Sequence, residues 1–255
     1  MPFAEPCLDL ARQRLDPELA LVLEGTETSL PPFWKGYCST GKAERLQCLA
    51  AEMHEMADYF PETAQRLMAV ASDVFLARSP GLGLCRLIAV ELNGETYFRY
   101  SRCPLGYVPS VDSAIVDLIR TRAPEAITYL YFEMMDGLTD LHDLVGFKNR
   151  LALTTVEAEI DTYGEMPDFE RLEAMGDIGN IVEILGSGGG GYLLLDLNRD
   201  MRTDTDPGAL RISGNGGWSP EEPVPLFGML DAWMAVGLGQ TEPTRGKEKF
   251  SASGA

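Results

Sequence analysis

Histidine is scarce in this sequence, and its cysteines are not closely spaced. Its 255 residues include only two histidines, His54 and His142, and five scattered cysteines that form no C-x-x-C pair. The cysteine pattern favours free thiols in a reducing compartment over a disulfide framework or a zinc site. The hydrolase and metalloprotease motifs G-x-S-x-G and H-E-x-x-H are missing as well. Because few residues of the types that usually carry catalysis are present in a recognisable pattern, we expect the chain not to be an enzyme.

Long apolar runs are also missing. No apolar stretch approaches the roughly 20 residues that a membrane-spanning helix needs. The first sixteen residues, "MPFAEPCLDLARQRLD", lack the apolar core of a signal peptide. The sequence therefore predicts a cytoplasmic protein that makes no membrane contact.

Basic residues are few compared with acidic ones. The chain has 21 Lys and Arg against 39 Asp and Glu, a net charge of −18, and residues 111–240 alone carry 23 acidic and 8 basic side chains. Such a surface repels nucleic acid and anionic membranes, because binding to phosphate depends on Lys and Arg. It suits a basic protein partner. A second interpretation is that the charge only keeps the protein soluble.

The most distinctive stretch that is present is "ILGSGGGGYLLLDLN". Gly186, Gly188 and Gly191 match the G-x-G-x-x-G spacing of a dinucleotide site, but that site needs a helix after the glycines. Here an apolar strand follows, and no Gly-Lys-Ser/Thr is present. The stretch therefore predicts a turn over Gly188, Gly189, Gly190 and Gly191 between two strands, and no nucleotide cofactor. The strand after it lacks alternation, which predicts a central position in a sheet.

Two other segments have partial site patterns. His142 lies between Asp140 and Asp143, a combination that could serve acid–base chemistry but is more typical of a loop among carboxylates. The loop that starts at Asp196 begins with the D-x-N-x-D spacing of a calcium loop. It has Met201 where glycine is needed and Pro207 where the closing glutamate is needed. We expect no metal site.

The order of patterns predicts an α+β fold. Helical spacing covers residues 1–30, with a second helix starting at Pro17, then residues 43–60 and a helix from Pro61 that includes Val74 and Phe75. A β-hairpin over 84–103 turns at Asn93-Gly94. Two helices over 111–135, strands over 150–155 and around the glycine turn, a polar loop over 198–217 and a last helix from Pro225 follow. We expect a helical region over 1–80, an α+β domain over 81–240 with its core at 111–240, and a disordered tail over 241–255.

Three stretches between residues 111 and 240 carry a family resemblance. They are "APEAITYLYFEMMDG" with "RLALTT" after it, "ILGSGGGGYLLLDLN", and the closing helix "LFGMLDAWMAVGL". With these features the segment resembles the SUKH superfamily, which includes fungal cell-wall-assembly regulators and many bacterial immunity proteins. The chain departs from the family pattern at Asp136-Gly137, where Asn-Gly is more typical, and the resemblance leaves the first 110 residues unexplained.

The resemblance implies a mostly antiparallel sheet flanked by helices, and a protein that neutralises a cognate toxin by occlusion. The acidic charge agrees, because toxins that act on nucleic acid need basic surfaces. The candidate partner-binding residues are Asp136, Asp140, Asp143, Glu157, Glu159, Asp161 and Glu165. We expect structural roles for the four glycines of the turn and for Trp218, Phe227 and Trp233. An intracellular scaffold of the same fold, or a small-ligand enzyme around His142, is the alternative.

Overall fold

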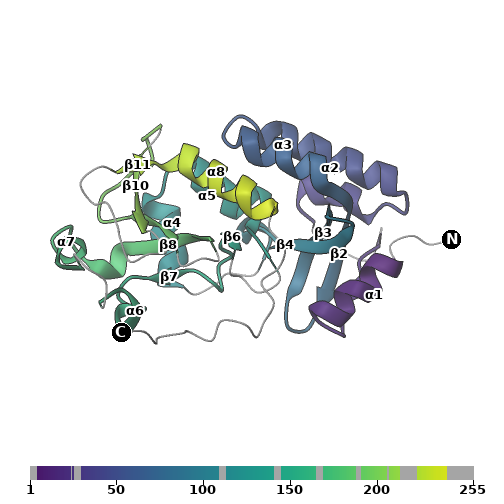
Figure 1. The fold of residues 1–255 in the computed structure, drawn as a ribbon, viewed down its shortest axis with the longest axis horizontal. Coiled ribbons are helices and arrows are strands. Elements are labelled where there is room, and N and C mark those ends of the chain that lie inside the picture. The colour runs from purple at the N-terminus through teal and green to yellow at the C-terminus, as the bar shows by residue number, and fades with distance from the viewer. Residues whose placement is uncertain are drawn as a thin grey trace, which may run out of the picture.

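A computed structural model gives the fold (Figure 1). The structure describes residues 5–23, 25, 30–108, 113–140, 145–164, 169–187, 191–205, 207–212 and 223–239. Within these ranges the strands form one 11-stranded antiparallel sheet, in the order β1-β2-β3-β4-β5-β6-β8-β9-β10-β11, with β7 paired to β8. The strands are β1 (Ala20–Leu21), β2 (Ala71–Ser79), β3 (Gly83–Leu92), β4 (Glu95–Arg102), β5 (Asp136–Thr139), β6 (Val145–Phe147), β7 (Thr154–Thr155), β8 (Ile181–Ser187), β9 (Tyr192–Asp196), β10 (Gly208–Ile212) and β11 (Val224–Pro225).

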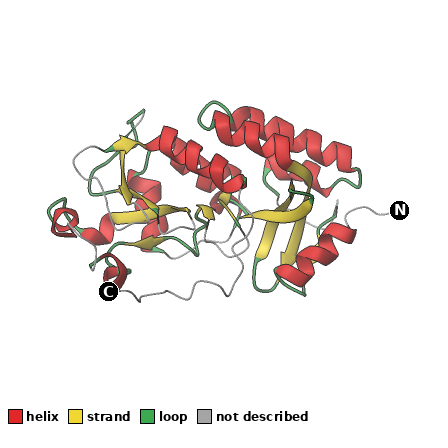
Figure 2. Cartoon of the chain, viewed as in Figure 1, coloured by secondary structure: helices red, strands yellow, loops and turns green. Residues whose placement is uncertain are grey.

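Helices cover the sheet on both faces (Figure 2). The α-helices are α1 (Glu5–Arg14), α2 (Lys42–Met56), α3 (Pro61–Val70), α4 (Ala114–Arg122), α5 (Glu125–Tyr129), α6 (Ile160–Tyr163), α7 (Phe169–Glu173) and α8 (Leu226–Leu238). Short 3-10 turns lie at η1 (Pro32–Cys38), η2 (Leu105–Tyr107) and η4 (Ile178–Asn180), and α5 continues into a π-helical turn, η3 (Leu130–Met134). The α+β class and the mostly antiparallel sheet are therefore confirmed.

The buried side chains of the described residues form three clusters. The largest packs α2, α3, α4, α5 and α8 against one face of the sheet. On the opposite face α1 covers the strands of the β2–β4 hairpins, and α6 and α7 cover β8, β9 and β10. Successive side chains along a strand point to opposite faces of the sheet and so join different clusters. Leu193 and Leu195 belong to the large cluster, and Leu194 belongs to the cluster beneath α6 and α7. The prediction that this strand is central and covered on both faces is confirmed.

The hairpin at Asn93-Gly94 is also confirmed. β3 and β4 pair from Leu92 opposite Glu95 to Cys85 opposite Arg102. Asn93 and Gly94 have φ angles of 55° and 82°, the left-handed values that a two-residue turn between right-twisted strands requires.

The N-terminal part of the chain differs from the prediction. The helix that starts at Pro61 ends at Val70, and Ala71–Ser79 form β2 rather than a continued helix. A continuous apolar run does not distinguish a doubly covered strand from a buried helix, and here Val74 and Phe75 enter clusters on opposite faces of the sheet. No helix starts at Pro17; the short strand β1 pairs with β2 instead. The boundary expected at residue 80 therefore falls between two paired strands of one sheet.

Other corrections concern short strands. The predicted polar loop over 198–217 contains β10, which pairs with β9. Of the strand predicted over 150–155, only Thr154–Thr155 is a strand, β7. Another short strand, β6, precedes this segment at Val145–Phe147. The helix that was expected to stop at Asp136-Gly137 ends at Met134, and Asp136 already belongs to β5. These segments are too short to show a period, and pairing with a neighbouring strand decides their conformation.

Candidate protein-binding surface

Two of the predicted partner-binding carboxylates lie in the interior. Asp136 is 0% exposed and Asp140 is 1% exposed. The Asp136 carboxylate accepts hydrogen bonds from the Arg150 backbone N–H at 2.7 Å and from Arg150 Nη1 at 2.5 Å. Burial raises the pKa of Asp136 to about 6, although Arg150 and Arg102 act to lower it. The expectation that these two carboxylates meet a partner is wrong, because β5 places Asp136 inside the sheet; Asp143 lies outside the described residues.

Three other predicted carboxylates are exposed and close together in the chain. Glu157, Glu159 and Asp161 lie on the turn after β7 and the start of α6. Thr155 forms this turn, since its Oγ1 accepts a hydrogen bond from Ala158 N at 3.2 Å and its carbonyl accepts one from Glu159 N at 3.2 Å. We call Glu157, Glu159 and Asp161 the acidic surface. Glu165 lies outside the described residues.

Buried neighbours hold this turn on the sheet. Val156 and Tyr163 are buried in the cluster beneath α6 and α7. The Tyr163 hydroxyl donates to Glu183 Oε2 on β8 at 2.6 Å, and Lys148 Nζ lies 2.6 Å from the other carboxylate oxygen of Glu183. Because the apolar and internal polar contacts point inward, the carboxylates of the acidic surface are left toward solvent.

The charges of the acidic surface are not neutralised within the described part of the chain. The structure gives no ion pair there for Glu157, Glu159 or Asp161, and Glu159 has only a long contact of 3.4 Å from the Thr154 hydroxyl. Residues 154–180 contain eight acidic side chains and one basic one. Exposed carboxylates in this density produce a negative potential that attracts cations.

A groove lies beside the acidic surface, between α4, the turn after β7 and η4. It has a volume of about 280 Å³. Its lining residues are Ala114, Ile115, Leu118, Thr155, Glu157, Gly179 and Asn180. One wall is therefore apolar and belongs to α4, and the other is formed by Thr155, Glu157, Gly179 and Asn180, with the carboxylate of Glu157 next to Gly179.

Hydrogen bonds fix the polar wall of the groove. The Asp177 carboxylate caps η4 by accepting from Gly179 N at 2.9 Å. Asn198, just after β9, accepts from Asp177 N at 3.1 Å and from Asn180 Nδ2 at 3.2 Å through the same Oδ1 atom. A Cβ on Gly179 would lie 2.8 Å from Glu157 Oε2, so glycine at this position lets the carboxylate pack against η4.

The basic side chains of α4 interact away from the groove. Arg120 pairs with Asp117 at 3.1 Å on its own helix, and its guanidinium carbon lies 4.8 Å from the centre of the Phe132 ring. Arg122 Nη1 donates to the Leu197 carbonyl at 2.9 Å. Sequence reasoning missed the groove residues of α4 and η4, because nothing in the local sequence indicates that these segments meet.

The glycine stretch joins two paired strands. Within its described part, Ser187 N donates to the Gly191 carbonyl at 2.9 Å and Gly191 N donates to Ser187 Oγ at 3.0 Å. β9 pairs with β8, so a strand rather than a helix follows the glycines, as predicted. Gly188, Gly189, Gly190 and Trp218 lie outside the described residues.

Phe227 and Trp233 lie on α8 and pack, half-buried, against the large cluster. A Cβ on Gly191 would lie 3.3 Å from Cη2 of Trp233, so the indole covers the end of the glycine stretch. The fully buried positions of the helix are Leu226 and Leu230. Trp233 and Phe227 thus contribute to the attachment of α8, and Leu226 and Leu230 are the more deeply buried anchors.

The remaining candidate segments show ordinary loop contacts. In the calcium-like loop Asp200 pairs with Arg202 at 2.6 Å and Asp204 pairs with Arg199 at 2.7 Å. Among the described residues no three His, Cys, Asp or Glu side chains are grouped for a metal ion. His54 is exposed on α2, and His142 lies outside the described residues.

Comparisons with known proteins found no relative of this chain. No family model matches the chain, and no curated protein or solved structure is significantly similar to it. The resemblance to the SUKH superfamily therefore stays a prediction. Among the helices that the structure describes, none has the length and apolar character to cross a bilayer.

Proposed function

We propose that this chain is a non-enzymatic binding protein for a basic protein, and that the acidic surface of Glu157, Glu159 and Asp161 is where that protein docks. The observation that carries the proposal is the set of exposed carboxylates that have no cationic partner among the described residues, next to a groove with one apolar wall. In the most specific form of this proposal, the partner is a toxin and the chain is a bacterial immunity protein that neutralises the toxin. A cytoplasmic location is part of this proposal.

The mechanism is occlusion with electrostatic steering. A protein that holds nucleic acid has a basic surface, and an acidic protein that covers this surface prevents the nucleic acid from binding. Opposite charges on the rims of two surfaces act mainly on the association rate, which salt reduces. The contacts at the centre of the interface determine how slowly the complex dissociates.

A capture experiment followed by kinetics tests the proposal. The full chain is tagged and its partner is isolated from the native organism, and association is then measured by stopped flow at low and physiological salt. We expect the association rate to fall at least about tenfold between the two salt concentrations, within the range that steering produces. We expect the double variant Glu159→Lys and Asp161→Lys to lower the rate further at low salt.

The matched control reverses two exposed carboxylates that lie outside the acidic surface, Glu18→Lys and Asp58→Lys. It changes the net charge by the same amount, so a surface-specific effect is larger in the first variant than in the control. Circular dichroism checks that both variants are folded. Association that responds equally to the two double variants would contradict docking at the acidic surface.

A further inference from the structure

We propose that the groove between α4, the turn after β7 and η4 holds an arginine side chain of the basic partner. This inference rests on the proposed function, because it assumes a protein partner, and it adds the residue that the partner must present.

The apolar wall matches the stem of a long side chain. Ile115 and Leu118 are partly buried against the large cluster, and each lines the groove from α4 together with Ala114. A long cationic side chain can lay its methylene groups on such a surface while its charged end reaches a polar group. The volume of about 280 Å³ leaves space for both parts.

The polar wall offers acceptors. Within the described residues no hydrogen bond reaches the Glu157 carboxylate or Asn180 Oδ1, whereas Asn180 Nδ2 already donates to Asn198 and, at 3.4 Å, to Asp177. The Thr155 hydroxyl oxygen already accepts from Ala158 N. A ligand that only donates hydrogen bonds and carries positive charge complements this wall.

Arginine fits these requirements better than lysine does. Its planar guanidinium has five donors, so it can bind a carboxylate with two parallel hydrogen bonds and still donate to a neighbouring amide oxygen. Arginine is also enriched in the cores of protein interfaces, where lysine is depleted. The pre-formed polar wall, fixed through Asn198, reduces the cost of ordering the groove on binding.

Peptide titration tests the groove without the natural partner. The probes are the blocked tripeptides acetyl-Gly-Arg-Gly-amide, the same peptide with citrulline, and the same peptide with lysine. Citrulline keeps the shape of arginine and removes its charge. We expect the arginine peptide to shift the backbone amide NMR signals of Gly179 and Asn180 in the full chain, with affinity at least about tenfold above that of the citrulline peptide. We expect the lysine peptide to bind several times more weakly than the arginine peptide.

Two matched variants locate the effect. Glu157→Gln removes the carboxylate of the groove, and we expect it to lower the affinity for the arginine peptide at least about tenfold. Glu173→Gln removes an exposed carboxylate of α7 that does not line the groove, and we expect it to leave the affinity unchanged. The inference is overturned if arginine, lysine and citrulline peptides bind alike, if the shifted amides lie elsewhere, or if the two variants behave alike.

The captured partner separates this inference from the proposed function. If salt and the double variant Glu159→Lys and Asp161→Lys leave association unchanged, the proposed function fails. If they slow association but Glu157→Gln accelerates dissociation no more than Glu173→Gln, docking at the acidic surface stands and the arginine groove is overturned.

Discussion

Burial raises the pKa of one interior carboxylate, that of Asp136. Its charged form is disfavoured by burial more than it is favoured by Arg150, so its pKa is raised to about 6 in the folded protein from an ordinary value of 3.8. A folded pKa above the unfolded one means that the native state binds more protons between these values. The free energy of unfolding from this group therefore falls as pH rises.

We expect the stability of the protein to decrease between about pH 4 and pH 6 through Asp136, by an amount on the order of 3 kcal/mol if the full pKa difference acts. Urea unfolding at several pH values measures this slope. Asp136→Asn keeps an oxygen that can accept from the Arg150 N–H and does not ionise in this pH range, so the slope of the variant should be flatter than that of the unchanged protein. Parallel slopes would show that Asp136 has an ordinary pKa.

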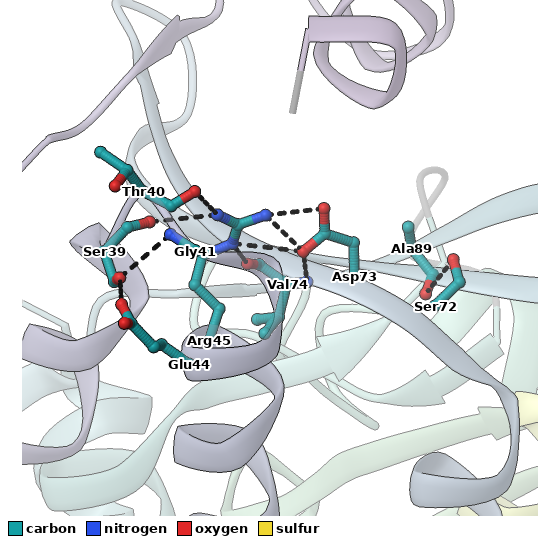
Figure 3. A network of polar contacts seen from close by, with 9 residues as sticks. All are labelled: Ser39, Thr40, Gly41, Glu44, Arg45, Ser72, Asp73, Val74 and Ala89. Carbon is teal, nitrogen blue, oxygen red and sulfur yellow. Dashed lines mark hydrogen bonds and ion pairs between the residues drawn. The ribbon is translucent and has the colours of Figure 1, made fainter. Parts of the chain in front are cut away.

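At the scale of elements, buried arginines connect segments that are distant in sequence. Arg45 on α2 is 0% exposed and makes a two-pronged ion pair with Asp73 on β2, with Nη2 at 2.7 and 2.8 Å from the carboxylate oxygens (Figure 3). Its remaining donors reach the carbonyls of Ser39, Thr40 and Val74. Arg86 on β3 pairs through Nη1 with Oε1 of the buried Glu52 of α2, and the other oxygen of Glu52 accepts from the Tyr37 hydroxyl. These contacts fix α2 and the loop before it on the sheet.

We expect Arg45→Met to lower the free energy of unfolding by about 3–5 kcal/mol, because the methionine fills part of the volume but leaves the Asp73 carboxylate buried without its partner. Urea unfolding measures the change. Arg66→Met, at an exposed position of α3, is the matched control and should change stability by less than about 0.5 kcal/mol. Equal effects of the two substitutions would show that the ion pair contributes nothing specific.

For the whole molecule, the continuity of the sheet has a direct consequence. β2 and β3 pair along their length, and α2 and α3 share the large cluster with α4, α5 and α8. A chain that starts at residue 81 would lose β2 and expose the edge of β3 together with the apolar surface beneath α2 and α3. Unpaired strand edges and uncovered apolar surface are unfavourable in water and promote aggregation.

We therefore expect residues 81–255 alone to lack a cooperative thermal transition by circular dichroism and to bind the dye ANS, as loosely packed chains do. The full chain should show a sharp transition and little dye binding under the same conditions. A cooperative transition of the shortened chain would instead support the domain boundary that the sequence predicts near residue 80.

The sequence by itself determined the features that depend on neighbouring residues. Asn93-Gly94 specified a hairpin, because the conformation of a two-residue turn depends on the turn residues themselves. The apolar run Leu193 to Leu195 indicated a strand covered on both sides, and the composition established the acidic charge. The sequence predicts partner binding for all of these carboxylates on the same grounds, yet Glu157, Glu159 and Asp161 are exposed whereas Asp136 and Asp140 are buried.

Only the tertiary structure decided which carboxylates face solvent, where the helix that starts at Pro61 becomes β2, and that Ile115, Glu157 and Asn180 line one groove. The physical reason is the same in each case. Burial, strand pairing and the closeness of distant segments depend on how the whole sheet assembles, and a residue's immediate neighbours in sequence do not by themselves fix that assembly.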